Sequence, residues 1–160
     1  MPEMNRRDFL LATGVAAVAC LSLPVLQPAA FAAAPTMPDK PVDVGALKDF
    51  DKDGVTDTFA KKPNYFYLVR KDGKLYACSA VCTHKYAALT VKSDEFYCPK
   101  HKSEFSYEGT VTAGPAKSSL PRYAISLGAD GKITVDMTKT FEEKKWDDAA
   151  SFVEVPKAAP

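Results

Sequence analysis

The chain has 160 residues, which is enough for one domain with a buried core once a removable N-terminal segment is set aside. Its 21 basic and 20 acidic side chains leave a formal net charge of +1. That balance excludes the strongly basic surface of a nucleic-acid-binding protein, so we expect no nucleic-acid partner.

Residues 1–34 have the order of regions that is typical of an export signal. Arg6 and Arg7 are followed by an apolar run over residues 9–26 and then by a cluster of small residues. The adjacent arginines resemble a twin-arginine signal, the export route for folded proteins, and predict a periplasmic protein. Two alternatives stand: an ordinary secretory signal, and an uncleaved apolar run that anchors the protein in the membrane.

The next segment, residues 35–43, contains three prolines and reads as a linker. Residues 44–136 alternate short apolar runs with turn signals, including Asp72-Gly73 and Asp130-Gly131, which predict two hairpins. This pattern predicts an all-β fold, a small antiparallel sandwich or barrel. The expected strands are 65–70, 74–79, 95–98, 104–107, 110–112, 123–127 and 132–136.

Residues 137–160 form a C-terminal extension of a different character. The segment 140–143 fits a helix capping box, and Trp146, Ala149 and Val153 fall on one helical face. We expect a short helix that packs on the sandwich. A partner-docking surface anchored by Trp146 is the alternative.

An acidic segment, residues 49–57, imitates a calcium loop, with acidic residues at the first, third, fifth and ninth places and Gly54 at the sixth. The twelfth place, where a bidentate glutamate is needed, is Ala60. A solvated turn that enters a strand is therefore the favoured interpretation.

The chain has only two histidines, and each follows a cysteine at a short, loop-compatible spacing. Cys82 with His84 and Cys98 with His101 provide two thiolates and two imidazoles. This set suits either a [2Fe–2S] centre or a structural zinc ion. If Cys20 is removed with the signal and the other two cysteines bind the metal, Cys78 has no partner for a disulfide, and we expect it to be a small buried residue on a strand.

The two boxes, C-T-H and C-P-x-H, resemble those of the Rieske iron–sulfur family. Ser103, two places after the second histidine, and the proline loop at 114–116 extend the resemblance, which covers residues 44–136. It implies a [2Fe–2S] cluster in which Ser103 donates a hydrogen bond. It places Cys82 and Cys98 on the buried iron and His84 and His101 on the outer iron. Of the two fold types, it implies the small antiparallel sandwich, with two loops that form a cluster-binding subdomain.

The chain also departs from the high-potential members of that family. Their loop disulfide would need cysteines where this chain has Ala87 and Lys100, and their glycine and tyrosine are here Lys102 and Phe105. The ligand loops must therefore be held by packing and hydrogen bonds alone. We expect a reduction potential below the top of the family range of about −150 to +300 mV, while Lys85, Lys100 and Lys102 raise it.

The resemblance implies an exported one-electron carrier, or an electron-transfer subunit of a respiratory oxidoreductase complex of the molybdenum oxidase or cytochrome bc type. Its redox partner would be a c-type cytochrome, a quinol complex or a molybdenum oxidase subunit. The chain is not expected to be catalytic alone, because both histidines bind the cluster. The alternative is a structural or interaction module stapled by zinc, although C-x-H is tighter than usual zinc spacing.

Overall fold

The computed structural model of the protein describes residues 36–156. The expected signal segment, residues 1–34, lies outside the described residues. Within residues 36–156, no helix has the length and apolar character that a membrane crossing would take.

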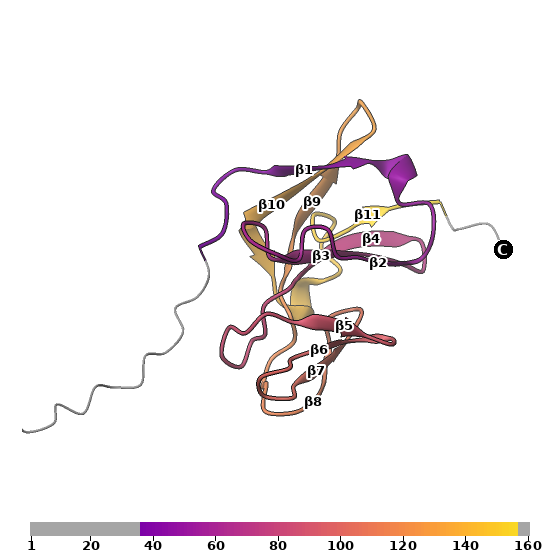
Figure 1. The fold of residues 1–160 in the computed structure, drawn as a ribbon. Helices are drawn as coiled ribbons and strands as arrows, with labels where there is room; N and C mark the ends of the chain where they lie inside the picture. Colours follow the sequence, from indigo (N-terminus) through magenta and orange to yellow (C-terminus); the bar gives the residue numbers. More distant parts are fainter. Residues whose placement is uncertain (1–35, 157–160) are drawn as a thin grey trace, which may run out of the picture. The chain divides into compact units, whose positions relative to one another are not determined.

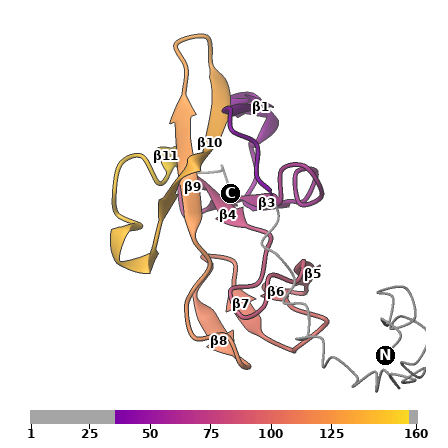
Figure 2. The same cartoon turned by 90° about the vertical axis from the view of Figure 1, so that its left-hand side faces the viewer.

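The described chain forms two antiparallel sheets (Figures 1 and 2). The larger sheet has seven strands in the order β1-β10-β9-β4-β3-β2, with β11 paired to β4. The smaller sheet has four strands in the order β5-β6-β7-β8 and is inserted between β4 and β9. The strands of the larger sheet are β1 (Val42–Ala46), β2 (Gly54–Thr56), β3 (Phe66–Lys71), β4 (Lys74–Ser79), β9 (Arg122–Leu127), β10 (Lys132–Phe141) and β11 (Val153–Glu154). Those of the smaller sheet are β5 (Thr90–Lys92), β6 (Glu95–Tyr97), β7 (Glu104–Ser106) and β8 (Val111–Ala113).

Both predicted hairpins are present, and the all-β antiparallel fold is confirmed. The β3–β4 hairpin turns at Asp72-Gly73, where both residues have positive φ values of 54° and 76°. The β9–β10 hairpin turns at Gly131, with φ 78°. These turns follow from local sequence, because Asp-Gly supplies the left-handed conformation that short hairpin turns require.

Strand β3 connects two hydrophobic cores, because successive side chains of a strand point to opposite faces. Phe66 and Leu68 pack in the core of the larger sheet, whereas Tyr67 and Val69 pack in a second core that reaches the smaller sheet. Tyr67 stacks on Phe96 of β6 at 4.6 Å between ring centroids. Its hydroxyl also donates to the carbonyl of Leu89 at 2.8 Å. The smaller sheet is thereby fixed against a strand that is buried on both faces.

The prediction of a C-terminal helix is wrong. Strand β10 continues to Phe141, so the expected cap residue Thr140 lies in a strand. After this strand the chain forms a single 3₁₀ turn, η3 (Glu143–Lys145), and then β11. Trp146 is held by contacts distant in sequence: its ring lies 4.2 Å from the Arg122 guanidinium. These contacts outweigh the local capping preference.

The acidic segment 49–57 forms the end of a 3₁₀ turn, η2 (Leu47–Asp49), and strand β2, which pairs with β3. Asp53 forms an ion pair with the buried Arg70 at 3.4 Å. The segment thus enters a strand, as predicted.

Candidate metal centre

Three loops of the smaller sheet carry the residues singled out by the sequence. The first loop, residues 80–89, connects β4 to β5; the second, 98–103, connects β6 to β7; the third, 114–121, connects β8 to β9. The Thr83 hydroxyl of the first loop donates to the Ser118 carbonyl of the third at 2.7 Å. The Ala116 amide of the third loop donates to Ser103 Oγ of the second at 3.2 Å. The third loop therefore ties the other two together.

The first and second loops are built as the same turn. The Cys82 amide donates to the Ala87 carbonyl at 2.8 Å, and the Tyr86 amide donates to the Cys82 carbonyl at 3.0 Å. Cys98 makes the equivalent two bonds with residues 103 and 102, at 2.9 and 2.8 Å. Ala87 and Lys100 stand where a loop disulfide would need cysteines, so these backbone hydrogen bonds, and not a disulfide, close each loop around its cysteine.

The fifth residue of each turn has a left-handed backbone. Tyr86 has φ 52° and Lys102 has φ 59°. A residue with a Cβ atom pays roughly 1–2 kcal/mol for this conformation. The resemblance places a glycine at position 102, so this chain keeps the turn geometry but forms it with a strained lysine.

The four predicted metal ligands come together at these turns. Cys82 and Cys98 are fully buried and are not joined in a disulfide. The rings of His84 and His101 lie 4.8 Å apart between centroids, at an interplanar angle of 88°. Each ring is half-buried, so two thiols lie inside and two imidazoles lie nearer the surface.

The histidine nitrogens that face inward have no protein partner. Nδ1 of His84 and Nδ1 of His101 are both buried, and within residues 36–156 neither makes a hydrogen bond. Buried polar atoms are normally paired, and a pair of unpaired acceptors beside two buried thiols is what a metal centre would satisfy. The donor set of this chain therefore fits a metal cofactor, which Nδ1 of each histidine would hold.

The two candidate cofactors differ in the number of protein ligands that they need at one metal ion. In the described part of the chain, no three histidine, cysteine, aspartate or glutamate side chains gather where a single metal ion could be held. A structural zinc ion needs four such ligands around one point. A [2Fe–2S] centre of mixed ligation asks for only two protein ligands at each iron.

The protein groups around the site keep both the Cys82 thiol and the His84 imidazole neutral, so a bound metal would have to displace the thiol proton. Burial raises the pKa of the Cys82 thiol, and the neighbouring Cys98 thiol acts in the same direction. The His84 amide and the Ser103 hydroxyl oppose this by donating to the sulfur. Burial lowers the pKa of His84, as do the nearby His101 and Lys85, which keeps this imidazole in the neutral form that binds metals.

Ser103 is fully buried between the second and third loops. Because its oxygen accepts from the Ala116 amide, its proton is available to the Cys82 sulfur. The sequence predicted that this hydroxyl donates to a sulfur of the cluster. The structure places the hydroxyl beside the sulfur of Cys82. A hydrogen bond to a sulfur of the cluster itself stays a prediction.

Gly114 allows the third loop to approach the second. Its φ is +87°, and a Cβ atom at this position would lie 2.4 Å from the Lys102 carbonyl oxygen and 2.5 Å from Ser103 Cα. Both distances are far below any real Cβ contact. Only glycine fits here without displacing the loop that carries His101.

The C-terminal extension reaches this third loop through a contact that the sequence did not indicate. Glu143 Oε2 accepts a hydrogen bond from the Ser119 hydroxyl at 2.8 Å, and Ser119 Oγ accepts from the Val111 amide at 3.1 Å. Ser119 is buried, so the bond fixes the end of the loop. The sequence places Glu143 in a predicted helix capping box with Thr140, and no sequence signal pairs it with Ser119.

Cys78 lies in β4 and is fully buried, as predicted. Burial raises the pKa of its thiol to about 12. It is therefore a protonated, unreactive thiol at neutral pH.

Comparison with known proteins agrees with this geometry. The family model described as the Rieske [2Fe-2S] domain matches residues 40–124. A cytochrome b6-f complex iron-sulfur subunit of Chlorobaculum thiosulfatiphilum is 31% identical over 140 residues, which cover 82% of this chain and 75% of that protein. The cyanelle cytochrome b6-f iron-sulfur subunit 1 of Cyanophora paradoxa is 35% identical over 75 residues, 44% of this chain and 31% of that protein. Among solved structures, the plasma membrane Rieske protein PetC3 of Synechocystis is 29% identical, with a TM-score of 0.45, over 59% of this chain and 97% of that one.

Proposed function

We propose an exported, respiratory role for this chain, which belongs to the Rieske [2Fe-2S] domain family and is therefore an electron-transfer protein with a [2Fe–2S] cluster. In this role it carries single electrons within an oxidoreductase complex of the cytochrome bc type. Family membership sets aside the zinc-stapled module as the function of the site.

The observation that carries the proposal is the pair of buried thiols beside two inward-facing, unpaired imidazole nitrogens. Cys82 and Cys98 would hold one iron, and Nδ1 of His84 and Nδ1 of His101 would hold the other. When bound, a cluster with this ligand set supplies one-electron chemistry at a potential that the neutral imidazoles raise.

The protein's own groups perform three tasks around that chemistry. The closed turns of the first and second loops hold the ligands, and the Ser103 hydroxyl stabilises negative charge on sulfur. The burial of Cys82 and Cys98 places the inner side of the site in the protein interior. Because Nδ1 of each histidine faces inward and the rings are half-exposed, the opposite ring edges form the exit toward a partner.

The cytochrome bc-type assignment rests on similarity to cytochrome b6-f subunits, including one that aligns with 82% of this chain. The export assignment rests on the arginine pair in residues 1–34. A molybdenum oxidase subunit and a c-type cytochrome are the other partners that remain open to test. An uncleaved N-terminus that anchors the protein also remains part of the proposal.

Export is tested by replacing Arg6 and Arg7 with lysine, which keeps the charge of the signal. We expect the [2Fe–2S] protein to shift from the periplasmic or membrane fraction to the cytoplasm, because the twin-arginine route requires both arginines. Unchanged export of the variant would contradict this route.

The complex is tested by affinity purification of the tagged protein from detergent-solubilised membranes. Recovery of b-type haem supports the cytochrome bc assignment, and recovery of molybdenum would overturn it.

A further inference from the structure

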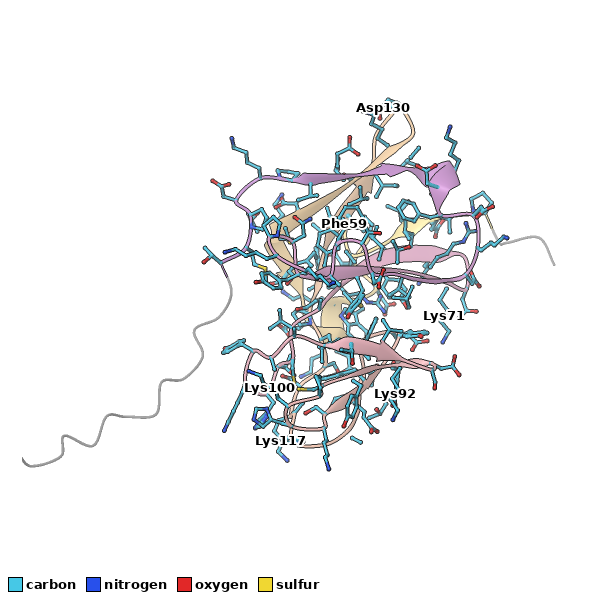
Figure 3. All side chains as sticks on the ribbon, viewed as in Figure 1. Phe59, Lys71, Lys92, Lys100, Lys117 and Asp130 are labelled. Carbon is cyan, nitrogen blue, oxygen red and sulfur yellow. The ribbon has the colours of Figure 1, made fainter. Side chains whose placement is uncertain are left out.

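Four lysines surround the exposed edge of the histidine pair. We define the lysine rim as Lys85 of the first loop, Lys100 and Lys102 of the second loop, and Lys117 of the third. All four are exposed, and Figure 3 shows Lys100 and Lys117 at the same end of the smaller sheet. The bonds that join the third loop to the other two bring the rim together in space.

The lysine rim carries an uncompensated positive charge. The three loops contain no aspartate or glutamate, and the acid closest in sequence is Glu104, at the start of β7. Of the ion pairs formed by residues 36–156, none involves a rim lysine. Because the whole chain has a net charge of only +1, the rest of it is net negative. The histidine edge therefore carries a local excess of positive charge on a chain whose remainder is net negative.

An exposed aromatic side chain lies within the same rim. Tyr86, next to Lys85, is 53% exposed and is held by its left-handed backbone in the closed turn of the first loop. Exposed tyrosines of fixed geometry are favoured at protein interfaces, because the ring provides contact area at little entropic cost. The surface thus combines an aromatic contact, a positive rim and the two half-exposed histidines.

We propose that this surface docks an acidic redox protein, with the lysine rim meeting carboxylates around the partner's own electron-accepting group. The inference rests on the proposed function and specifies the partner's chemistry. A protein is favoured over an anionic membrane, because a lipid surface seated on the rim would cover the histidine edges through which electrons leave. Complementary charge raises the rate of encounter and orients the two redox centres.

The test is stopped-flow oxidation of the reduced, cluster-loaded protein by two probes, a purified acidic c-type cytochrome and a purified basic one of similar potential. At about 0.01 M salt, where the Debye length is about 30 Å, we expect the acidic cytochrome to react at least about tenfold faster. At about 1 M salt, where the length is about 3 Å, the ratio should approach one.

Two triple variants locate the effect. Substitution of Lys85, Lys100 and Lys117 by glutamine should abolish the low-salt preference, while Lys102 is left alone because its backbone is strained. The matched control replaces three exposed lysines on the side of β1 and β2, which are Lys40, Lys48 and Lys52. Both variants lose the same net charge and differ only in where it is lost. Because only the rim lysines surround the histidines, only the rim variant should lose the preference for the acidic cytochrome. The cluster spectrum and the reduction potential are measured for each, so that altered driving force is separated from altered encounter.

The outcomes are distinguishable. Equal rates with both cytochromes at low salt, or equal losses in the two triple variants, would overturn the inference and leave the proposed function intact. Failure of both cytochromes to oxidise the protein at either salt concentration would overturn the proposed function and the inference with it. Rim-dependent sedimentation with phosphatidylglycerol vesicles, without a cytochrome preference, would assign the surface to lipid and overturn the inference.

Discussion

The tightest contact at the site is the one that Gly114 makes with the second loop, and it gives the most quantitative prediction. In Gly114→Ala, the new Cβ atom would lie 2.4 Å from the Lys102 carbonyl oxygen, whereas real Cβ atoms stay beyond 3.0 Å. The second loop or the third must therefore move by at least that difference. Since the contact is with backbone, no side-chain rotation can relieve it.

Two costs add in this variant. Alanine at φ +87° is strained by roughly 1–2 kcal/mol, and overpacking typically costs about 1–3 kcal/mol more. The total of about 2–5 kcal/mol is a large share of the roughly 5–15 kcal/mol that stabilises a domain. We expect the unfolding midpoint of the cluster-loaded protein to fall by about 10 °C, measured by cluster absorbance and circular dichroism. The electron paramagnetic resonance signal should also broaden or shift, because the moving loop carries His101.

Gly131→Ala is the matched control. Gly131 has a similar φ of +78° in the β9–β10 turn, but a Cβ atom there would meet nothing within 4 Å. We expect it to lose only the strain of roughly 1–2 kcal/mol and to keep the wild-type cluster signal. Equal losses in the two variants, with an unchanged cluster signal in both, would refute the argument that the third loop fixes the second.

Three further predictions concern single side chains. Lys102→Gly should raise the unfolding midpoint of the protein by relieving a φ of 59°, with a gain of up to about 1 kcal/mol after the added entropy of glycine. Glu143→Gln should lower the free energy of unfolding by about 1 kcal/mol in urea titrations, because Ser119 exchanges a charged acceptor for a neutral one. Burial acts to raise the pKa of Glu108, but its hydrogen bonds with Lys71 and Ser106 and the charge of Lys71 together outweigh this and lower the pKa to about 2. A depressed folded-state pKa stabilises the fold above the unfolded value of 4.5 and loses this contribution as the pH falls toward 2. Glu108→Gln should therefore lose less free energy of unfolding than the wild type between pH 5 and 3, measured by urea unfolding at each pH. The difference between the two proteins should be modest, because the Glu108 side chain is 37% exposed.

Each of these predictions has a contradicting result. Lys100→Gly, without a left-handed backbone to relieve, should lower the midpoint, and a rise equal to that of Lys102→Gly would contradict the strain argument. Glu142→Gln should be neutral, because its side chain makes no hydrogen bond within residues 36–156, and an equal loss there would contradict the Ser119 contact. A parallel acid profile for Glu108→Gln and the wild type would show that the Lys71 ion pair contributes nothing.

The parts of the fold that the sequence predicted are those determined by local chemistry. The Asp72-Gly73 turn specifies a hairpin because few residues adopt its conformation, and alternating apolar runs specify the flanking strands. The family was also predictable, because the C-T-H and C-P-x-H boxes at Cys82 and Cys98 are specific to it, whereas the ligand set itself stays a prediction.

The parts that the sequence could not predict depend on contacts between distant segments. The C-terminal helix was wrong because the Trp146 ring packs on Arg122 and because β10 continues past the expected cap. The hydrogen bond from Ser119 to Glu143 joins two unremarkable residues 24 positions apart. The left-handed backbone at Lys102 could not be predicted, because lysine has no preference for that conformation.

The central claim is that His84 and His101 ligate one iron of a [2Fe–2S] cluster through nitrogen. The most direct test is pulsed electron paramagnetic resonance of the reduced protein, produced with its native cluster and with nitrogen-15 histidine. These are the only two histidines in the chain, so any strong histidine nitrogen coupling comes from this pair. We predict a rhombic signal with an average g value below that of all-cysteine clusters and coupling to two nitrogen-15 nuclei. A reduced protein without such coupling, or a silent protein that contains zinc alone, would contradict this ligation.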